Sequence, residues 1–317
     1  MAGDRSRVLR CLDNCKAHVD YVDVVDDEGF TALLGAANLG HTEVVKVLIA
    51  RGADVNYSGN RLTALMQAVQ HGHVKVVKLL CAAGAKTQAV DNYGWTPLLM
   101  AAETGNVEIS RTLCRHGADV NAVTTLRNTP LSIAAREGHA DLVSYLLLET
   151  SADRTATDVQ GFTALMLAAH NGRTDVVRVM CQADVDLTSS SRNGYTSLMI
   201  AADKGYTEVV RLLCEAGADN SARTAQEGST ACMIAAESGH LGVVRELCCS
   251  GADTNATSDR GFSATMIAAQ NGHHMVIREL HSWGACMDHR NYLGSAALHL
   301  AAGRNFVKAA TALLEVG

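Results

Sequence analysis

Four residues near the C-terminal end of the sequence could bind a metal ion, since histidine and cysteine are the usual ligands of zinc. They are His273, His281, Cys286 and His289, the densest group of such side chains in the chain. The group lacks the closely paired cysteines of common zinc sites. Histidine also stands at the position of His273 in other segments, as His41, His73, His139 and His240. We therefore expect His273 to be structural, and we expect no metal ion and no other cofactor.

The ten cysteines could supply a nucleophile or disulfides. Five of them share one position of a recurring segment, eighteen residues after its anchor (Thr63 to Cys81): Cys81, Cys114, Cys181, Cys214 and Cys248. Equivalent helices of a stack lie roughly 8–10 Å apart, whereas the Cα atoms of a disulfide are rarely more than about 7 Å apart. These cysteines are therefore interpreted as small core residues in a reducing compartment. No base or oxyanion site accompanies them, so we expect no catalytic residue and no enzyme.

The recurring segment is the strongest signal in the sequence. GFTALMLAAHNG from Gly161 has close copies such as GWTPLLMAAETG from Gly94 and GYTSLMIAADKG from Gly194. The anchors of nine copies are 32 to 34 residues apart and are Thr31, Thr63, Thr96, Thr129, Thr163, Thr196, Thr230, Ser263 and Ala296. A period this regular predicts an elongated stack of helical units, in which each unit buries its apolar face against its neighbours.

One copy illustrates the expected local structure. Thr96 is placed to cap a short helix and Pro97 suits its first turn. The alanine pair that follows Met100 allows close helix packing. Gly105 ends this helix, and a second apolar stripe follows until Gly117, which we expect in the left-handed conformation. A row of methionines after the anchors, Met66, Met166, Met199, Met233 and Met266, is interpreted as core packing.

These segments resemble the ankyrin repeat, whose pattern is G-x-T-P-L-H-x-A-A-x-x-G-H-x-x-V-V-x-x-L-L-x-x-G-A-D-V-N. The resemblance covers roughly residues 24–317, and Gly52–Asn56 and Gly117–Asn121 repeat the family's terminator in register. It implies an all-α solenoid of helix-turn-helix units with projecting β-hairpin loops, and a module that binds other proteins without catalysis. We expect a degenerate capping segment at residues 1–25 and about nine repeats at 26–317, the last one truncated.

The copies depart from the pattern in a few places. The hairpin glycine is replaced by Arg61 and Arg127. One residue is interpreted as inserted at 149–151 and two as lost after Cys181, so we expect a weak joint there, with fast amide exchange from Glu149 to Arg192. The end at Gly317 leaves two alternatives open: a self-contained scaffold, or the target-recognition arm of a larger ligase, channel or kinase.

The candidate binding surface follows from register in the repeat. Residues before the anchors lie at hairpin tips, and the two residues before the mid-repeat glycine face the groove. These groove positions are Asn38/Leu39, Gln70/His71, Glu103/Thr104, Arg136/Glu137, His170/Asn171, Asp203/Lys204, Glu237/Ser238, Gln270/Asn271 and Gly303/Arg304. Aromatic anchors dominate many protein interfaces. The residues predicted to contact a partner are Phe30, Trp95, Phe162, Tyr195, Phe262, Tyr93, Arg136, Glu137, His170, Asn171, Asp203 and Lys204.

Composition narrows the class of partner. The net charge is −6, with 33 acidic and 27 basic residues well mixed, which is unlike a nucleic-acid groove or a membrane-binding face. No apolar stretch has the length of a signal peptide core or a membrane-spanning helix. We expect a soluble monomer in the cytoplasm or the nucleus that binds a protein or a peptide.

Overall fold

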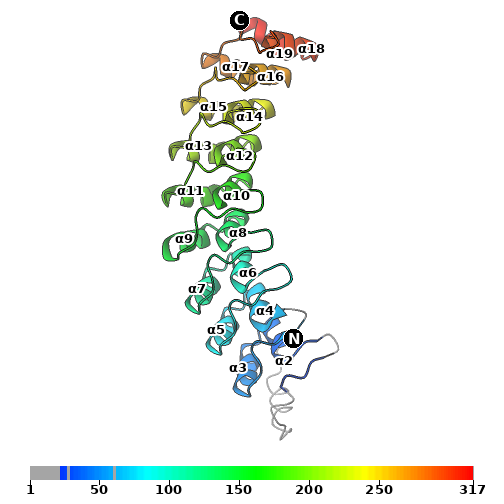
Figure 1. Ribbon diagram of the computed structural model, residues 1–317, viewed down its shortest axis with the longest axis vertical. Helices are drawn as coiled ribbons and strands as arrows, with labels where there is room; N and C mark the ends of the chain where they lie inside the picture. The colour runs from blue at the N-terminus through cyan, green and yellow to red at the C-terminus, as the bar shows by residue number, and fades with distance from the viewer. Residues whose placement is uncertain (1–21, 27–28, 60–61, 317) are drawn as a thin grey trace. The chain divides into compact units, whose positions relative to one another are not determined.

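The computed structural model describes residues 22–26, 29–59 and 62–316 (Figure 1). The expected capping segment at residues 1–25 lies outside these residues except for 22–25. The described chain divides into two compact units: unit 1 holds the residues up to Ala134 together with Asp141–Asp153, and unit 2 holds Ala135–Ala140 together with the residues from Arg154 on. Each unit is described separately below.

Unit 1 is a stack of helix pairs. Its first helices contact one another in the order α2 (Ala32–Asn38), α4 (Ala64–Gln70) and α6 (Pro97–Thr104). Its second helices do the same in the order α3 (Thr42–Ala50), α5 (Val74–Ala82) and α7 (Val107–Arg115) (Figure 1). Strands β1 (Ser58–Gly59) and β2 (Leu62–Thr63) form an antiparallel hairpin in which Ser58 pairs with Thr63. The division between the units falls within α8 (Pro130–Glu137) and α9 (Ala140–Glu149).

Unit 2 repeats the same arrangement (Figure 1). Its first helices are α10 (Ala164–His170), α12 (Ser197–Lys204), α14 (Ala231–Ser238), α16 (Ala264–Gln270) and α18 (Ala297–Gly303). Its second helices are α11 (Thr174–Gln182), α13 (Thr207–Glu215), α15 (Leu241–Cys249), α17 (His274–Ser282) and α19 (Val307–Val316). Isolated β-bridges join Thr257 to Ser263 and Arg290 to Ala296. The prediction of an all-α repeat solenoid with projecting hairpin loops is confirmed.

The anchor residues cap the first helices, as expected. The Thr96 hydroxyl accepts a hydrogen bond from the Leu99 backbone N–H at 3.3 Å, and Pro97 stands in the first turn. Thr31, Thr63, Thr163, Thr196 and Ser263 cap in the same way. Thr230 differs, because its hydroxyl has no hydrogen-bond partner among the described residues. Such short helices are marginal in isolation, so the contacts between repeats stabilise them.

Small and flexible apolar side chains fill the core. All five methionines of the expected row are at most 1% exposed, which confirms their packing role. Cys81 and Cys248 are buried, the other three cysteines of the column are half-buried, and every described cysteine is a free thiol. Among the described residues, no helix is both long and apolar enough to span a membrane.

The insertion near residue 150 is confirmed, whereas the loss after Cys181 is wrong. Helix α9 has ten residues where α7 has nine, and the Thr150 hydroxyl donates to the Leu146 carbonyl just after the longer helix ends. After Cys181 the backbone keeps the ordinary hydrogen bonds, from Asp184 N–H to the Cys181 carbonyl and from Val185 N–H to the Met180 carbonyl.

Asp184 therefore occupies the position that glycine holds after most of the other second helices. Its φ is +54°, in the left-handed region, and Asp is one of the residues that tolerate it. At the hairpins, Arg127 likewise takes the place of glycine with a φ of +63°. Arg61 lies outside the described residues. Asp184 and Arg127 thus keep the register of the repeat, but each holds a strained backbone conformation that glycine adopts more easily.

Candidate functional site

Side chains within each hairpin turn satisfy its backbone. Asp91 Oδ1 accepts hydrogen bonds from the backbone N–H groups of Tyr93 and Trp95, both at 2.8 Å. Asp158 serves Gln160 and Phe162 in the same way. Where the first turn residue is a serine or threonine, its hydroxyl accepts from the residue before the anchor, as in the bond from Tyr195 N–H to Ser191 Oγ at 3.2 Å. Because the first turn residue holds the turn, the residues at its tip are free to vary.

Backbone hydrogen bonds link several of the turns to the next turn of the same unit. In unit 1, Thr125 N–H donates to the Tyr93 carbonyl at 3.1 Å, and in unit 2, Tyr292 N–H donates to the Arg260 carbonyl at 3.3 Å. Gly94 has a φ of +77°, and a β-carbon on it would lie 3.3 Å from Thr125 N. Glycine thus permits both the turn and the close approach of the neighbouring hairpin. The turn side chains of each unit are held in a regular row.

The aromatic residues before the anchors are half-buried and do not project as expected. Phe30 and Trp95 pack against the hydrophobic core of unit 1. Phe162, Tyr195 and Phe262 are half-buried in unit 2. Only part of each side chain remains available to a partner, so these residues contribute to packing within the repeat as well as to any contact.

The most exposed large apolar residues of the turns stand two or three positions earlier in the repeat. Tyr93 is 68% exposed, Tyr292 78% and Leu293 87%. Of these three residues, Tyr93 is the one that was predicted from the sequence to contact a partner. A contiguous contact would therefore involve the turn residues together with the exposed parts of the rings beside them.

The predicted groove residues do not form one cluster. Arg136 and Glu137 pair with each other at 2.8 Å, and Asp203 pairs with Lys204 at 3.0 Å. The remaining two predicted residues belong to α10 and its C-terminal end: the His170 ring lies 6.5 Å from the Phe162 ring, and the Asn171 amide donates to the Leu167 carbonyl at 2.8 Å. Adjacent charges that neutralise each other make weaker contributions to partner selection than unpaired ones.

One cavity of unit 2 does combine hairpin and groove residues, and we call it the unit 2 pocket. Its volume is about 310 Å³. It is lined by Glu227, Ser229, Glu237, Ser258, Arg260, Phe262, Ile267, Gln270, Asn271 and Arg304. Phe262 was a predicted contact, and Glu237, Gln270, Asn271 and Arg304 are groove positions. Glu227, Ser258, Arg260 and Ile267 were missed.

A signal for Glu227 was present in the sequence. The anchors Thr196 and Thr230 are 34 residues apart, one more than the usual spacing. The extra residue lies in the turn, where Gly228 N–H bonds to the Thr224 carbonyl four residues earlier, whereas Gly94 N–H bonds three residues back to Asp91. The longer turn brings Glu227 to the edge of the pocket.

The charges around the unit 2 pocket are unpaired. Glu227, Glu237, Arg260 and Arg304 form no ion pair with any other described residue. Burial raises the pKa of the Tyr195 phenol, and the nearby carboxylates of Asp203, Glu237 and Glu227 raise this pKa further. An acidic region thus extends from the pocket toward Tyr195.

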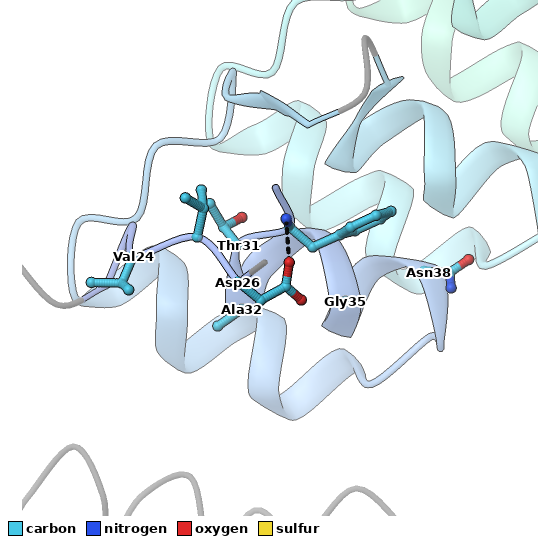
Figure 2. A pocket seen from close by; sticks show the side chains of 8 residues that line it. Val24, Asp26, Thr31, Ala32, Gly35 and Asn38 are labelled. Atoms are coloured by element: carbon cyan, nitrogen blue, oxygen red, sulfur yellow. Dashed lines mark hydrogen bonds between the residues drawn. The ribbon is translucent and has the colours of Figure 1, made fainter. Parts of the chain in front are cut away.

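Two further cavities lie in unit 1. The larger, of about 610 Å³, is lined by residues including Val24, Thr31, Gly35 and Asn38 (Figure 2). Gly35 stands where Met100 and Ile267 stand in other repeats, so the missing side chain leaves the hollow open. Figure 2 shows one wall held by the bond from Phe30 N–H to Asp26 Oδ1, at 2.8 Å.

The other cavity, of about 540 Å³, lies among α7, α9 and the adjacent loops. The Arg111 guanidinium stacks on the Tyr145 ring at 4.5 Å and forms a two-point ion pair with Glu149. Burial and a hydrogen bond with Cys114 raise the pKa of Tyr145 to about 12. These groups satisfy one another, which is typical of structural packing.

The second helices carry ion pairs between successive repeats. Lys78 pairs with Glu108 at 2.6 Å, and Arg245 pairs with Glu279 at 2.7 Å. Arg278 pairs with Glu315 in the same manner. The charges of this face are largely neutralised within the molecule, unlike those of the unit 2 pocket.

The histidine and cysteine side chains have structural roles. His273 Nε2 lies 2.9 Å from the Glu237 carbonyl, and His73 and His240 make the equivalent contact with the preceding repeat. Within the described chain, no three His, Cys, Asp or Glu side chains are grouped closely enough to hold a metal ion. Burial raises the pKa of the Cys81 thiol to about 11, which makes it a poor nucleophile near neutral pH.

Comparisons with known proteins agree with this architecture. A family model described as ankyrin repeats (3 copies) matches overlapping segments that together run from residue 4 to residue 317: 4–91, 57–124, 84–158, 122–190, 146–224, 181–258 and 232–317. A solved structure of the ankyrin repeat domain of Bcl-3, described as a unique member of the IkappaB protein family, is similar to 71% of this chain and to 100% of the Bcl-3 chain, with 28% identity and a TM-score of 0.62. No curated protein matched the sequence.

Proposed function

The chain belongs to the ankyrin-repeat family, and from this premise we propose that it is a non-catalytic scaffold that binds a partner protein or peptide along its groove and hairpin tips. Ankyrin repeats are generally protein-interaction modules. The expected partner contacts are the exposed turn residues, the exposed parts of the rings beside them and the residues at the ends of the first helices.

The observation that carries this proposal is that different side chains of a repeat stabilise the fold and face a possible partner. The anchor hydroxyls, the turn carboxylates and the histidines after the mid-repeat glycine satisfy the backbone. Most tip and groove side chains make no such bond, Asn171 and Asn271 being exceptions, and they differ from repeat to repeat. A surface whose identity the fold does not dictate is available for recognition.

The free thiols of the described residues support a reducing compartment, the cytoplasm or the nucleus. In this proposal the chain acts as a monomer, because its surface charge is mixed and the second helices pair their charges internally. The partner is a protein or a peptide, since the mixed charge does not suit nucleic acid.

Affinity capture from cell lysate, followed by quantitative mass spectrometry, tests the proposal with matched variants. The groove variant carries Tyr93→Ala, His170→Ala and Arg304→Ala, all at exposed positions. The control variant carries Glu43→Ala, Lys75→Ala and Lys308→Ala, which are exposed on second helices. Both sets should leave the fold intact, because exposed substitutions usually change stability by less than about 0.5 kcal/mol.

A partner that the groove variant loses and the control variant retains supports the proposal. Binding of that partner, once purified, should weaken by roughly tenfold or more in the groove variant, since interface anchors contribute about 1–2 kcal/mol each. Equal loss in both variants, or capture by neither the native chain nor the control, contradicts it.

A further inference from the structure

The unit 2 pocket has an acidic wall on the side of the α14 repeat. Glu227 stands in the turn that precedes α14, and Glu237 stands near the C-terminal end of the same helix. Both side chains line the cavity and both are exposed. Two carboxylates without a basic partner in the described chain attract a cationic side chain.

A second part of the pocket wall is basic. Arg260 comes from the turn that precedes α16, and Arg304 is the residue that ends α18. These guanidinium groups are exposed, and neither forms an ion pair with another described residue. Arginine presents several donors in a planar fork that matches a carboxylate, so this wall suits an acidic side chain.

The floor between the walls is partly apolar. Phe262 and Ile267 are half-buried and line the cavity. Ser258 beside them already accepts a hydrogen bond from Phe262 N–H at 3.2 Å, and the Asn271 amide donates to the Ile267 carbonyl at 3.0 Å. The floor therefore offers apolar surface whose neighbouring polar groups already have hydrogen-bond partners, which favours an apolar side chain.

The size and direction of the pocket limit its occupant. About 310 Å³ is near the lower limit for a ligand pocket. The lining comes from the repeats of three successive first helices, α14, α16 and α18, which contact in that order. Helices pack roughly 8–10 Å apart, so Glu237 on α14 and Arg304 after α18 are separated by roughly 16–20 Å, or about five or six residues of extended chain at about 3.3 Å each. Glu227 and Arg260 instead lie close together on neighbouring hairpins, because the Asp259 N–H donates to the Glu227 carbonyl at 2.9 Å.

We propose that the unit 2 pocket binds an extended peptide segment that places a Lys or Arg side chain against Glu237, an apolar side chain on Phe262 and Ile267, and an Asp or Glu side chain against Arg304. The cationic and acidic residues are five or six positions apart. The inference deepens the proposed function, because it names the chemistry of the partner segment and rests on that function.

The segregation of charge distinguishes this peptide from other ligands. A purely basic segment would meet Arg304 at one end of the pocket, and a purely acidic segment would meet Glu237 at the other. Like charges brought together across an interface oppose binding. Only a segment with both signs in the right separation satisfies both walls.

Selection from a displayed library of random nonapeptides against the full chain tests this inference. Enriched peptides should share a basic residue, a central apolar residue and an acidic residue at the stated separation. One such peptide, made synthetically, is then titrated by fluorescence anisotropy against native protein, Glu237→Gln and Arg304→Gln. Each substitution should weaken binding about fivefold, a typical effect for a partly exposed charge pair. The matched control is Glu43→Gln, an exposed glutamate on the second helix α3 in unit 1, which should bind as the native chain does.

Reversal of charge gives an independent readout. Glu237→Lys should reject the selected peptide and bind better to a version in which the basic residue is replaced by Glu. The inference is overturned if the enriched peptides lack one of the two charges, or if Glu237→Gln and Arg304→Gln leave the affinity of the peptide unchanged. Either result would still be compatible with peptide binding by another surface of the protein. If the library yields no enriched peptide, the inference is overturned, whereas a folded partner captured through the groove would still support the proposed function.

Discussion

Gly205, at the end of α12, has no room for a β-carbon. Its φ is +78°, and a β-carbon built on it would lie 2.7 Å from His240 Nδ1. The His240 ring must occupy that space, because its Nε2 lies 2.9 Å from the Asp203 carbonyl and ties the α14 repeat to the α12 repeat. Gly217, after α13 in the same repeat, also has a positive φ of +88°, but a β-carbon there meets nothing within 4 Å.

The two glycines allow steric displacement to be separated from backbone strain. In both Gly→Ala variants the left-handed conformation costs about 1–2 kcal/mol, partly offset by about 0.4–1 kcal/mol from the smaller entropy of the unfolded chain. Gly205→Ala must also displace His240 and break its hydrogen bond, which adds about 1–2 kcal/mol. We expect Gly205→Ala to destabilise by about 2–3 kcal/mol and Gly217→Ala by about 0.5–1 kcal/mol.

Native-state hydrogen exchange of the α12 and α14 amides measures this difference locally, which suits an array whose repeats need not unfold together. Protection should fall roughly tenfold further in Gly205→Ala than in Gly217→Ala, since about 1.4 kcal/mol corresponds to a factor of ten. The double variant Gly205→Ala with His240→Ala removes the clash and should lose less than the sum of its single changes. Equal effects in the two glycine variants, or strict additivity in the double variant, would refute the steric explanation.

Three further outcomes are expected. Trp95→Ala should destabilise the protein by about 1–3 kcal/mol because the Trp95 ring packs on the core. Tyr93 is 68% exposed, so Tyr93→Ala should leave the urea midpoint nearly unchanged. Equal midpoints for the two variants would show that the Trp95 ring contributes nothing to folding. Burial raises the pKa of the Cys81 thiol from 9.0 to about 11, so between these pH values the thiol stays protonated in the folded protein and ionises in the unfolded chain. The contribution of this thiol to stability is therefore complete below pH 9 and is lost as the pH rises from about 9 to 11. Urea titrations of Cys81→Ala should show a smaller loss of stability over this pH range. The amides of Asp184 and Val185 should exchange as slowly as those of Gly117 and Ala118, because both turns make the same two hydrogen bonds; much faster exchange after Cys181 would restore the predicted weak joint.

Much of the fold was predictable because residues with the same structural role recur at the same position in successive repeats. The threonine anchors, the paired alanines and the terminal glycines each have one physical role, and the structure assigns them that role. The same holds for His273, whose position recurs in four other copies and whose ring bonds to the preceding repeat. Signals that recur in register are easy to interpret correctly.

The errors came from places where one residue replaced another without a change in length. The Ala183-Asp184 pair was matched to the family's Ala-Asp terminator, which implied a two-residue loss. In fact Asp184 takes the left-handed glycine position and Val185 takes the buried alanine position, 6% exposed. Sequence identity favoured the wrong register, and only the backbone hydrogen bonds distinguish the two.

The places of the turn and groove side chains in the repeat were predictable, but their burial and their neighbours were not. Register did not indicate that Phe30 and Trp95 pack on the core, because the burial of a tip side chain depends on the neighbouring hairpin. Nor did it bring Glu227 and Arg260 together with Arg304, since these residues come from three different repeats.

The central claim is that this chain binds its partner through the hairpin turns and the ends of the first helices. Hydrogen exchange of the full chain, with and without a partner recovered by the capture experiment, tests that claim most directly. The account predicts added protection in the turns and at the C-terminal ends of helices such as α14 and α16, with the second helices α13, α15 and α17 unchanged. Protection confined to those second helices would contradict it.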